Sequence, residues 1–139
     1  MTVPTSRAPA APGPLAVRAV RGATQVASDD PALIEQATGE LLGEIMQRNE
    51  LSEADLISIV FTATDDLRST FPAAAARKLG LTDVPLLCTA EIAVPGSLNR
   101  VIRILAHVHS TQPRDAVHHV YLGAAAALRP DLSAPAPAN

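Results

Sequence analysis

Two residues of opposite charge lie inside strongly apolar stretches of the sequence. Arg103 falls in the run 101–108, and Glu91 falls in the run 84–92. A charged group removed from water must be paired or must bind a ligand of opposite charge, because its desolvation is otherwise prohibitive. The two residues therefore indicate a dry polar site, and the alternatives are an ion pair between neighbouring strands and a site that receives an anion.

Three further arginines and a tyrosine could add to such a site. Each has an ordinary structural interpretation: Arg21 in an edge strand, Arg77 at a helix end, Arg129 in a surface turn, and Tyr121 half-buried in a sheet. Taken together with Arg103 and Glu91, they would bind a compact polyanion and stabilise a redistribution of charge without covalent chemistry.

Other chemistry finds less support in the sequence. Cys88, the single cysteine, could be a nucleophile with a histidine as its base, but a small buried hydrophobe is the commoner role in an apolar strand. His107 and His109 have a spacing used by metal sites but no obvious third ligand, so no metal and no cofactor are predicted. Phosphate-binding and dinucleotide-binding glycine motifs are absent, as is a nucleophile elbow.

Composition narrows the class of protein. The chain has 139 residues, enough for one domain, with 47% hydrophobic and 18% charged residues. A net charge of −3 and only three aromatic residues argue against a nucleic-acid partner. No apolar run is long enough to span a membrane, and the start lacks the apolar core of a secretory signal. With one cysteine, these features predict a soluble cytoplasmic protein.

The elements that must position these residues follow from hydrophobic periodicity. Residues 1–14 and 133–139 are rich in proline and alanine and are expected to be disordered tails of a domain at 15–132. Five strands are expected, at 15–24, 56–62, 84–93, 100–110 and 117–122. Helices are expected at 31–49 and 71–80, with helical turns at 112–115 and 128–132. This order predicts an α+β fold, a mixed sheet with its helices on one face.

The fourth expected strand also predicts an interface. Its even-numbered residues, such as Ile102 and Ile104, share one face and should form the core. Arg103 shares the other face with Leu105 and His107, and that face is too apolar to stand in water. We therefore expect another subunit to cover part of the sheet, with a site at the boundary.

The sequence resembles the AroH-class, monofunctional chorismate mutases over about residues 16–133. The resemblance is carried by the following segments: Val20-Arg21-Gly22-Ala23-Thr24, residues 62–67 leading to Phe71-Pro72-Ala73, Cys88-Thr89-Ala90-Glu91, Gly96 to Arg103, His119-Val120-Tyr121-Leu122 and Leu128-Arg129-Pro130-Asp131-Leu132. It implies a chorismate mutase/ferredoxin-like fold, a homotrimeric pseudo-α/β barrel with interfacial sites, and conversion of chorismate to prephenate in phenylalanine and tyrosine biosynthesis.

The resemblance also implies roles for individual residues. Arg103 would donate to the ether oxygen, Arg21 and Tyr121 would hold a carboxylate, and Glu91 would accept from the ring hydroxyl, with Cys88 as a second polar partner there. The remaining substrate-binding residues would line or close the pocket: Phe71, Ala73, Leu87, Thr89, Ala90, Arg77, Leu128 and Arg129. Two positions depart from the family pattern, Ala74 where lysine is frequent and Leu87 where threonine is common.

Two other functions remain open at this level. A trimeric deaminase of the YjgF/RidA type would have a similar fold and interfacial sites, with an arginine for a carboxylate and a glutamate for water. A non-catalytic binder of aromatic-pathway acids could use the same scaffold. The combination of Cys88-x-x-Glu91 with Arg103 and Tyr121 favours the mutase.

Overall fold

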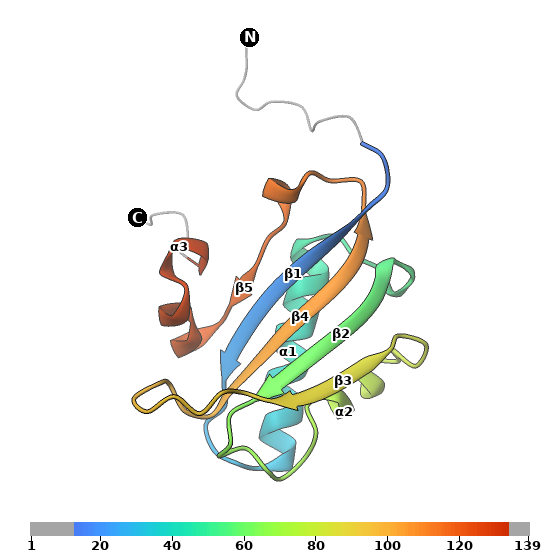
Figure 1. Ribbon diagram of the computed structural model, residues 1–139. Helices are drawn as coiled ribbons and strands as arrows, with labels where there is room; N and C mark the ends of the chain where they lie inside the picture. The colour runs from blue at the N-terminus through green and yellow to red at the C-terminus, as the bar shows by residue number, and fades with distance from the viewer. Residues whose placement is uncertain (1–12, 134–139) are drawn as a thin grey trace.

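The fold is a mixed five-stranded sheet with two helices packed on one face (Figure 1). The computed structural model describes residues 13–133. The strands are β1 (Ala16–Gln25), β2 (Leu56–Ala63), β3 (Leu86–Ala90), β4 (Val101–Ser110) and β5 (Val120–Tyr121), in the spatial order β3-β2-β4-β1-β5. The central strand β4 pairs antiparallel with β1 and β2, while β3 and β5 add in parallel at the two edges. The expected α+β fold is confirmed.

Helix α1 (Pro31–Arg48) begins where the sequence places a cap and a proline. The Asp30 carboxylate accepts a hydrogen bond from the Leu33 N–H, and Pro31 occupies the first helical position, where a missing N–H costs nothing. The apolar side of α1 buries Leu41, Leu42 and Ile45 completely. Helix α2 (Ala73–Lys78) contacts α1 on the same side of the sheet (Figure 1).

The main core lies between these helices and the sheet. Ile104, Ala106 and Val108 of β4 are at most 2% exposed, which confirms the core face expected for this strand. Gly22 of β1 allows α1 to approach closely, because a Cβ there would lie only 2.8 Å from Ile45 Cδ1. The opposite face of the sheet, which carries Arg103, is open in the centre of Figure 1.

A hydrogen-bonded turn fixes the start of β4. Arg100 has a positive φ of 52°, and its N–H donates to both carboxylate oxygens of Asp66 at 3.1 Å. The Thr64 hydroxyl donates to the same carboxylate and accepts from the Val101 N–H. These bonds hold the chain in a conformation that non-glycine residues rarely adopt, three residues before Arg103.

Several element boundaries differ from the sequence-based expectation. Strand β3 ends at Ala90 rather than residue 93, because its partner β2 ends at Ala63, the residue paired with Ala90. Strand β5 has two residues instead of six, and 3₁₀ helices cover Glu53–Asp55, Arg114–Ala116 and Gly123–Leu128. The expected turn at 128–132 is the short helix α3 (Pro130–Ser133). Of the expected tails, residues 1–12 and 134–139 lie outside the described part.

The exposed Gly43 on α1 offers a stabilising substitution. A Cβ at this position would meet no atom within 4 Å, so alanine fits without strain. We expect Gly43→Ala to raise the free energy of unfolding by about 0.5–1 kcal/mol, because glycine loses more backbone entropy in a helix than alanine. Chemical denaturation at a fixed protein concentration measures the change, and a lower stability would contradict it.

Candidate active site

Three of the sequence-predicted residues meet at one cavity on the open face of the sheet. Arg21 on β1, Arg103 on β4 and Tyr121 on β5 line a cavity of about 220 Å³, together with Val60, Thr62 and Leu105. The strand register places these three residues close together on one face of the sheet. Arg21 pairs with Leu105, and Ala23 pairs with both Arg103 and Tyr121. Two arginines and a phenol on apolar walls would attract and orient a small anion.

Glu91 lies beside this cavity and faces Arg103. Its Oε1 is 3.5 Å from Arg103 Nε and accepts a 2.6 Å hydrogen bond from the Thr62 hydroxyl. Arg103 Nε is buried and makes no hydrogen bond within the described part of the chain. The two charges inferred from apolar runs therefore do adjoin, while the arginine retains a donor that no protein acceptor uses.

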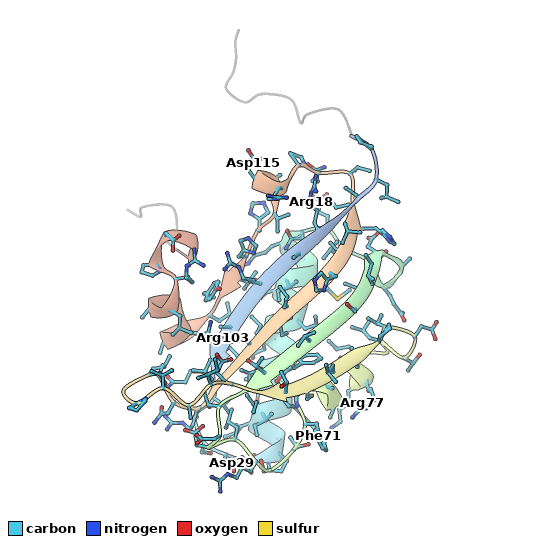
Figure 2. All side chains as sticks on the ribbon, in the orientation of Figure 1. Arg18, Asp29, Phe71, Arg77, Arg103 and Asp115 are labelled. Atoms are coloured by element: carbon cyan, nitrogen blue, oxygen red, sulfur yellow. The ribbon has the colours of Figure 1, made fainter. Side chains whose placement is uncertain are left out.

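A second group of predicted residues surrounds a different cavity. Phe71, Cys88, Thr89 and Ala90 line an opening of about 430 Å³ between β3 and the chain that follows β2. Figure 2 shows Phe71 and Arg77 near β3 and α2, away from Arg103. The predicted residues thus form two separate clusters within one chain.

Cys88 and Leu87 point to opposite faces of β3. Cys88 is paired in register with Phe61 and packs against the main core, whereas Leu87 is paired with Val60 on the open face and is 63% exposed. In the parallel pair β2–β3, Ile59 N–H donates to Pro85 O and Glu91 N–H donates to Ala63 O. These two bonds fix which residues of β3 direct their backbone groups toward β2: the odd-numbered ones. The Cys88 N–H and C=O therefore point to the unpaired edge of the sheet, where a ligand could reach them.

Comparison with known proteins decides the family. The model of the family "Chorismate mutase type I" matches residues 17–132. The chain belongs to this family. A chorismate mutase AroH from Thermus thermophilus is 51% identical over 117 residues, which are 84% of this chain and 96% of the relative. The AroH protein of Bacillus subtilis strain 168 is 41% identical over 118 residues, 84% of this chain and 93% of that one.

A solved structure supports the same assignment. The chorismate mutase from Clostridium thermocellum has a TM-score of 0.78 and 45% identity, over 78% of this chain and 97% of that one. The chain is therefore an enzyme of the chorismate mutase type, and the resemblance stated from its motifs is confirmed. The family assignment also sets aside the deaminase.

The other predicted residues of this chorismate mutase have varied surroundings. Ala73 is buried at the start of α2, and Arg77 is exposed at its end. Leu128 packs beside Val101 and Tyr121, covering one end of the open face. Arg129 pairs with Asp131 at 2.9 Å, and this hydrogen bond raises its pKa, so Arg129 stays a cation.

His119 is a neighbour of the site that belongs to the family resemblance but received no role from it. Its Nδ1 accepts a 3.0 Å hydrogen bond from the Arg21 N–H, directly before the β1–β5 pairing begins. Burial lowers the pKa of His119 below its usual 6.5, and the nearby charges of Arg21 and Arg129 lower it further. The neutral ring thus extends the pairing between β1, which carries Arg21, and β5, which carries Tyr121. The sequence predicts a structural position for His119 in the sheet, but no spacing indicates this bond.

The lowered pKa of His119 predicts a stability change with pH. His119 takes up a proton near pH 6.5 in the unfolded chain, but only at a lower pH in the folded chain. The stabilisation of the folded chain by neutral His119 is therefore fully present above pH 6.5 and is lost as pH falls through the lower folded pKa. We expect the free energy of unfolding to decrease from pH 7 to pH 5, and to decrease less in His119→Gln. Hydrogen bonds from Ser69 and Arg68 hold the pKa of Asp29 below 3.8, so this carboxylate affects the free energy of unfolding only at lower pH. Equal slopes in urea denaturation would contradict the prediction.

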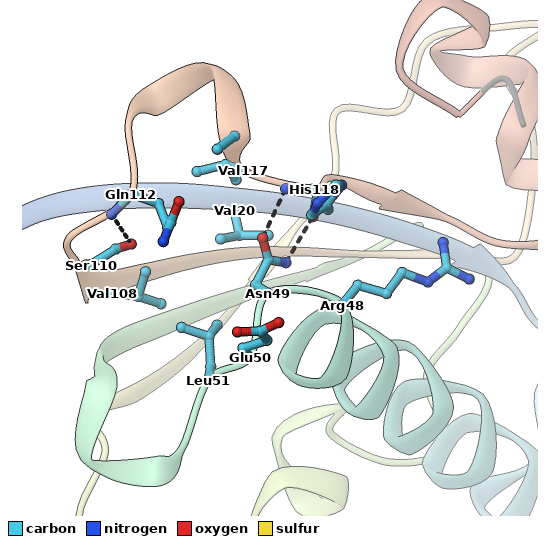
Figure 3. Close-up of a pocket in the computed structure, with 11 residues that line it drawn as sticks. Val20, Arg48, Asn49, Glu50, Leu51, Val108, Ser110, Gln112, Val117 and His118 are labelled. Atoms are coloured by element: carbon cyan, nitrogen blue, oxygen red, sulfur yellow. Dashed lines mark hydrogen bonds between the residues drawn. The ribbon is translucent and has the colours of Figure 1, made fainter. Parts of the chain in front are cut away.

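Another cavity of about 290 Å³ lies at the far end of α1 (Figure 3). Its walls include Val20, Asn49, Val108 and His118, and the Asn49 side chain bonds both backbone groups of His118. None of the predicted site residues line it. Within residues 13–133, no group of three or more His, Cys, Asp or Glu could hold a metal ion, and no helix is long and apolar enough to cross a membrane.

Proposed function

We propose that the protein converts chorismate to prephenate at the cavity lined by Arg21, Arg103 and Tyr121. The observation that carries the proposal is the unused Nε donor of Arg103 beside Glu91, in a cavity that already holds a second arginine. In this rearrangement a C–O bond breaks while a C–C bond forms, and negative charge grows on the ether oxygen. A fixed cationic donor at that oxygen stabilises the transition state more than the substrate.

The other residues bind the substrate in the compact conformer that reacts. Arg21 and Tyr121 hold a carboxylate from β1 and β5, and the Glu91 carboxylate accepts a hydrogen bond from the ring hydroxyl. Cys88 adds a contact near that hydroxyl, and the unpaired backbone groups of its strand edge support this role. Positioning of this kind lowers the barrier because the two ends of one molecule must meet, and no proton needs to move.

We further propose that each site is completed by a second copy of the chain, within a homotrimer. Two observations support this. Phe71 and Leu87 are 68% and 63% exposed although both are apolar and both are expected to contact substrate. The cluster around Phe71 and the cluster around Arg103 lie at different cavities of one chain. A cyclic trimer would bring the Arg103 cluster of one copy to the Phe71 cluster of the next.

In this arrangement Arg77 and Arg129 guide the dianion to the site and close its mouth, and Ala73 and Leu128 shape its walls. Ala74 does not supply the cation that the family often has at this position, so attraction of substrate relies more on those two arginines. We also propose a cytoplasmic location, which the single cysteine supports.

The proposed function is tested by mixing the purified protein with chorismate and following the ultraviolet absorbance of its ring diene. We expect the absorbance to decay with saturable kinetics, without added metal or cofactor. A protein that binds chorismate but leaves the absorbance unchanged would be a binder, and that outcome would overturn the proposal.

A further inference from the structure

Thr62 occupies a central place in the site although the family resemblance assigns it no role. It lies on the open face of β2, paired with Arg103 across one ladder and with Thr89 across the other. Its side chain lines the same cavity as Arg21, Arg103 and Tyr121. Its hydroxyl donates a 2.6 Å hydrogen bond to Glu91 Oε1, which is a short bond to a charged acceptor.

Glu91 needs such a partner because, among residues 13–133, one backbone hydrogen bond holds it. It follows the last residue of β3, and its N–H donates to Ala63 O at 2.9 Å. The next residues, including Ile92 at 80% exposure, extend toward solvent. A glutamate side chain with free rotamers loses conformational entropy when it is fixed. The Thr62 bond supplies the fixed geometry.

The contact between Glu91 and Arg103 does not fix the position of the Glu91 carboxylate. At 3.5 Å between Oε1 and Nε, the two groups attract each other without a hydrogen bond. Within residues 13–133, Glu91 Oε2 receives no hydrogen bond, so one carboxylate oxygen is held and the other is available. A carboxylate without the Thr62 bond would be free to move onto the guanidinium, where a bidentate pair is the favoured geometry.

We propose that Thr62 is a positioning residue for the rearrangement, which holds the Glu91 carboxylate so that the Arg103 guanidinium stays available to the ether oxygen. This inference rests on the proposed function. Holding Oε1 also leaves Oε2 for the ring hydroxyl of the substrate. Thr62 acts through Glu91 and Arg103, which are the groups that contact substrate.

The test compares Thr62→Val, which keeps shape and β-branching but loses the hydroxyl, with Thr62→Ser, which keeps the hydroxyl. We expect Thr62→Val to lower kcat by about 10- to 100-fold, the cost typical of misplacing a reacting group. KM should change much less, because Arg21 and Tyr121 still bind the carboxylate. Thr62→Ser should recover most of the lost rate.

A double-mutant cycle shows whether the effect passes through Glu91. In a Glu91→Ala background, adding Thr62→Val should cause little further loss, because the carboxylate that Thr62 positions is gone. Ser58→Ala is the matched control, since it removes a hydroxyl from the same face of β2, opposite His107 and outside the cavity. Thermal melts of all variants report folding.

Each outcome decides the inference. A normal kcat in Thr62→Val, an equal loss in the Glu91→Ala background, or no recovery by Thr62→Ser would each overturn it. Failure of the proposed function is distinguishable, because the unmodified protein would then leave chorismate unchanged.

Discussion

Replacing Arg103 with alanine is expected to lower kcat for chorismate by about 10³-fold or more, which corresponds to about 4 kcal/mol of transition-state stabilisation. Arg103 lines the cavity, and its buried Nε has no hydrogen-bond partner in the described part of the chain. The ether oxygen gains charge only as its bond breaks, so this interaction is made in the transition state. The value of kcat/KM should therefore fall along with kcat.

The Arg103 variants also separate charge from geometry. Arg103→Lys retains a positive charge but loses the planar fork, and we expect its kcat to stay at least about tenfold below that of the unmodified protein. Arg103 lies on the open face of the sheet, outside the main core, so the alanine variant should fold and assemble normally. Circular dichroism and gel filtration are the controls. Near-normal turnover by a folded Arg103→Ala protein would refute its role.

Mixing two inactive variants is expected to restore activity. Phe71→Asp places a carboxylate in the second cluster, where it should repel the dianionic substrate, while Arg103→Ala disables the first cluster. If each site takes one cluster from each of two neighbouring copies, a random 1:1 assembly contains fully intact sites at about a quarter of positions. Activity should therefore rise from nearly none to about a quarter of that of the unmodified enzyme.

This experiment requires subunits to exchange, so the two variants are co-expressed with different affinity tags and the doubly tagged species is purified. Because doubly tagged trimers always contain both variants, their intact fraction is somewhat above a quarter. The control is each variant purified alone by the same route. Activity no greater than the sum of the two controls would show that the site does not combine the two clusters from different copies.

The main elements of the fold were predictable because their signals are local. The cap at Asp30, the proline at position 31 and the helical spacing of apolar residues define α1 within one residue of its observed end. The ends of β3 and β5 were not predictable, because they depend on partners distant in sequence. Strand β3 stops where β2 does, and the Asn49 and His119 side chains take backbone groups that a longer β5 would have used.

The sequence predicted those residues of the candidate site whose charged side chains lie in apolar segments. Arg103 and Glu91 stand out because apolar strands rarely carry unpaired charges, and they do lie together. Thr62 could not be singled out, since threonine is common in strands and its bond to Glu91 spans 29 residues. The separation of Phe71 from Arg103 was likewise invisible, because the pattern of one chain does not show which cavity each residue lines.

The most direct test of the account is proton NMR of chorismate incubated with the unmodified protein and, in parallel, with Arg103→Ala at the same concentration. The account predicts stoichiometric conversion to prephenate by the unmodified protein, and no conversion beyond the spontaneous rate on the same timescale by the variant. Chorismate that persists with the unmodified protein, a product other than prephenate, or equal rates for the two proteins would contradict it.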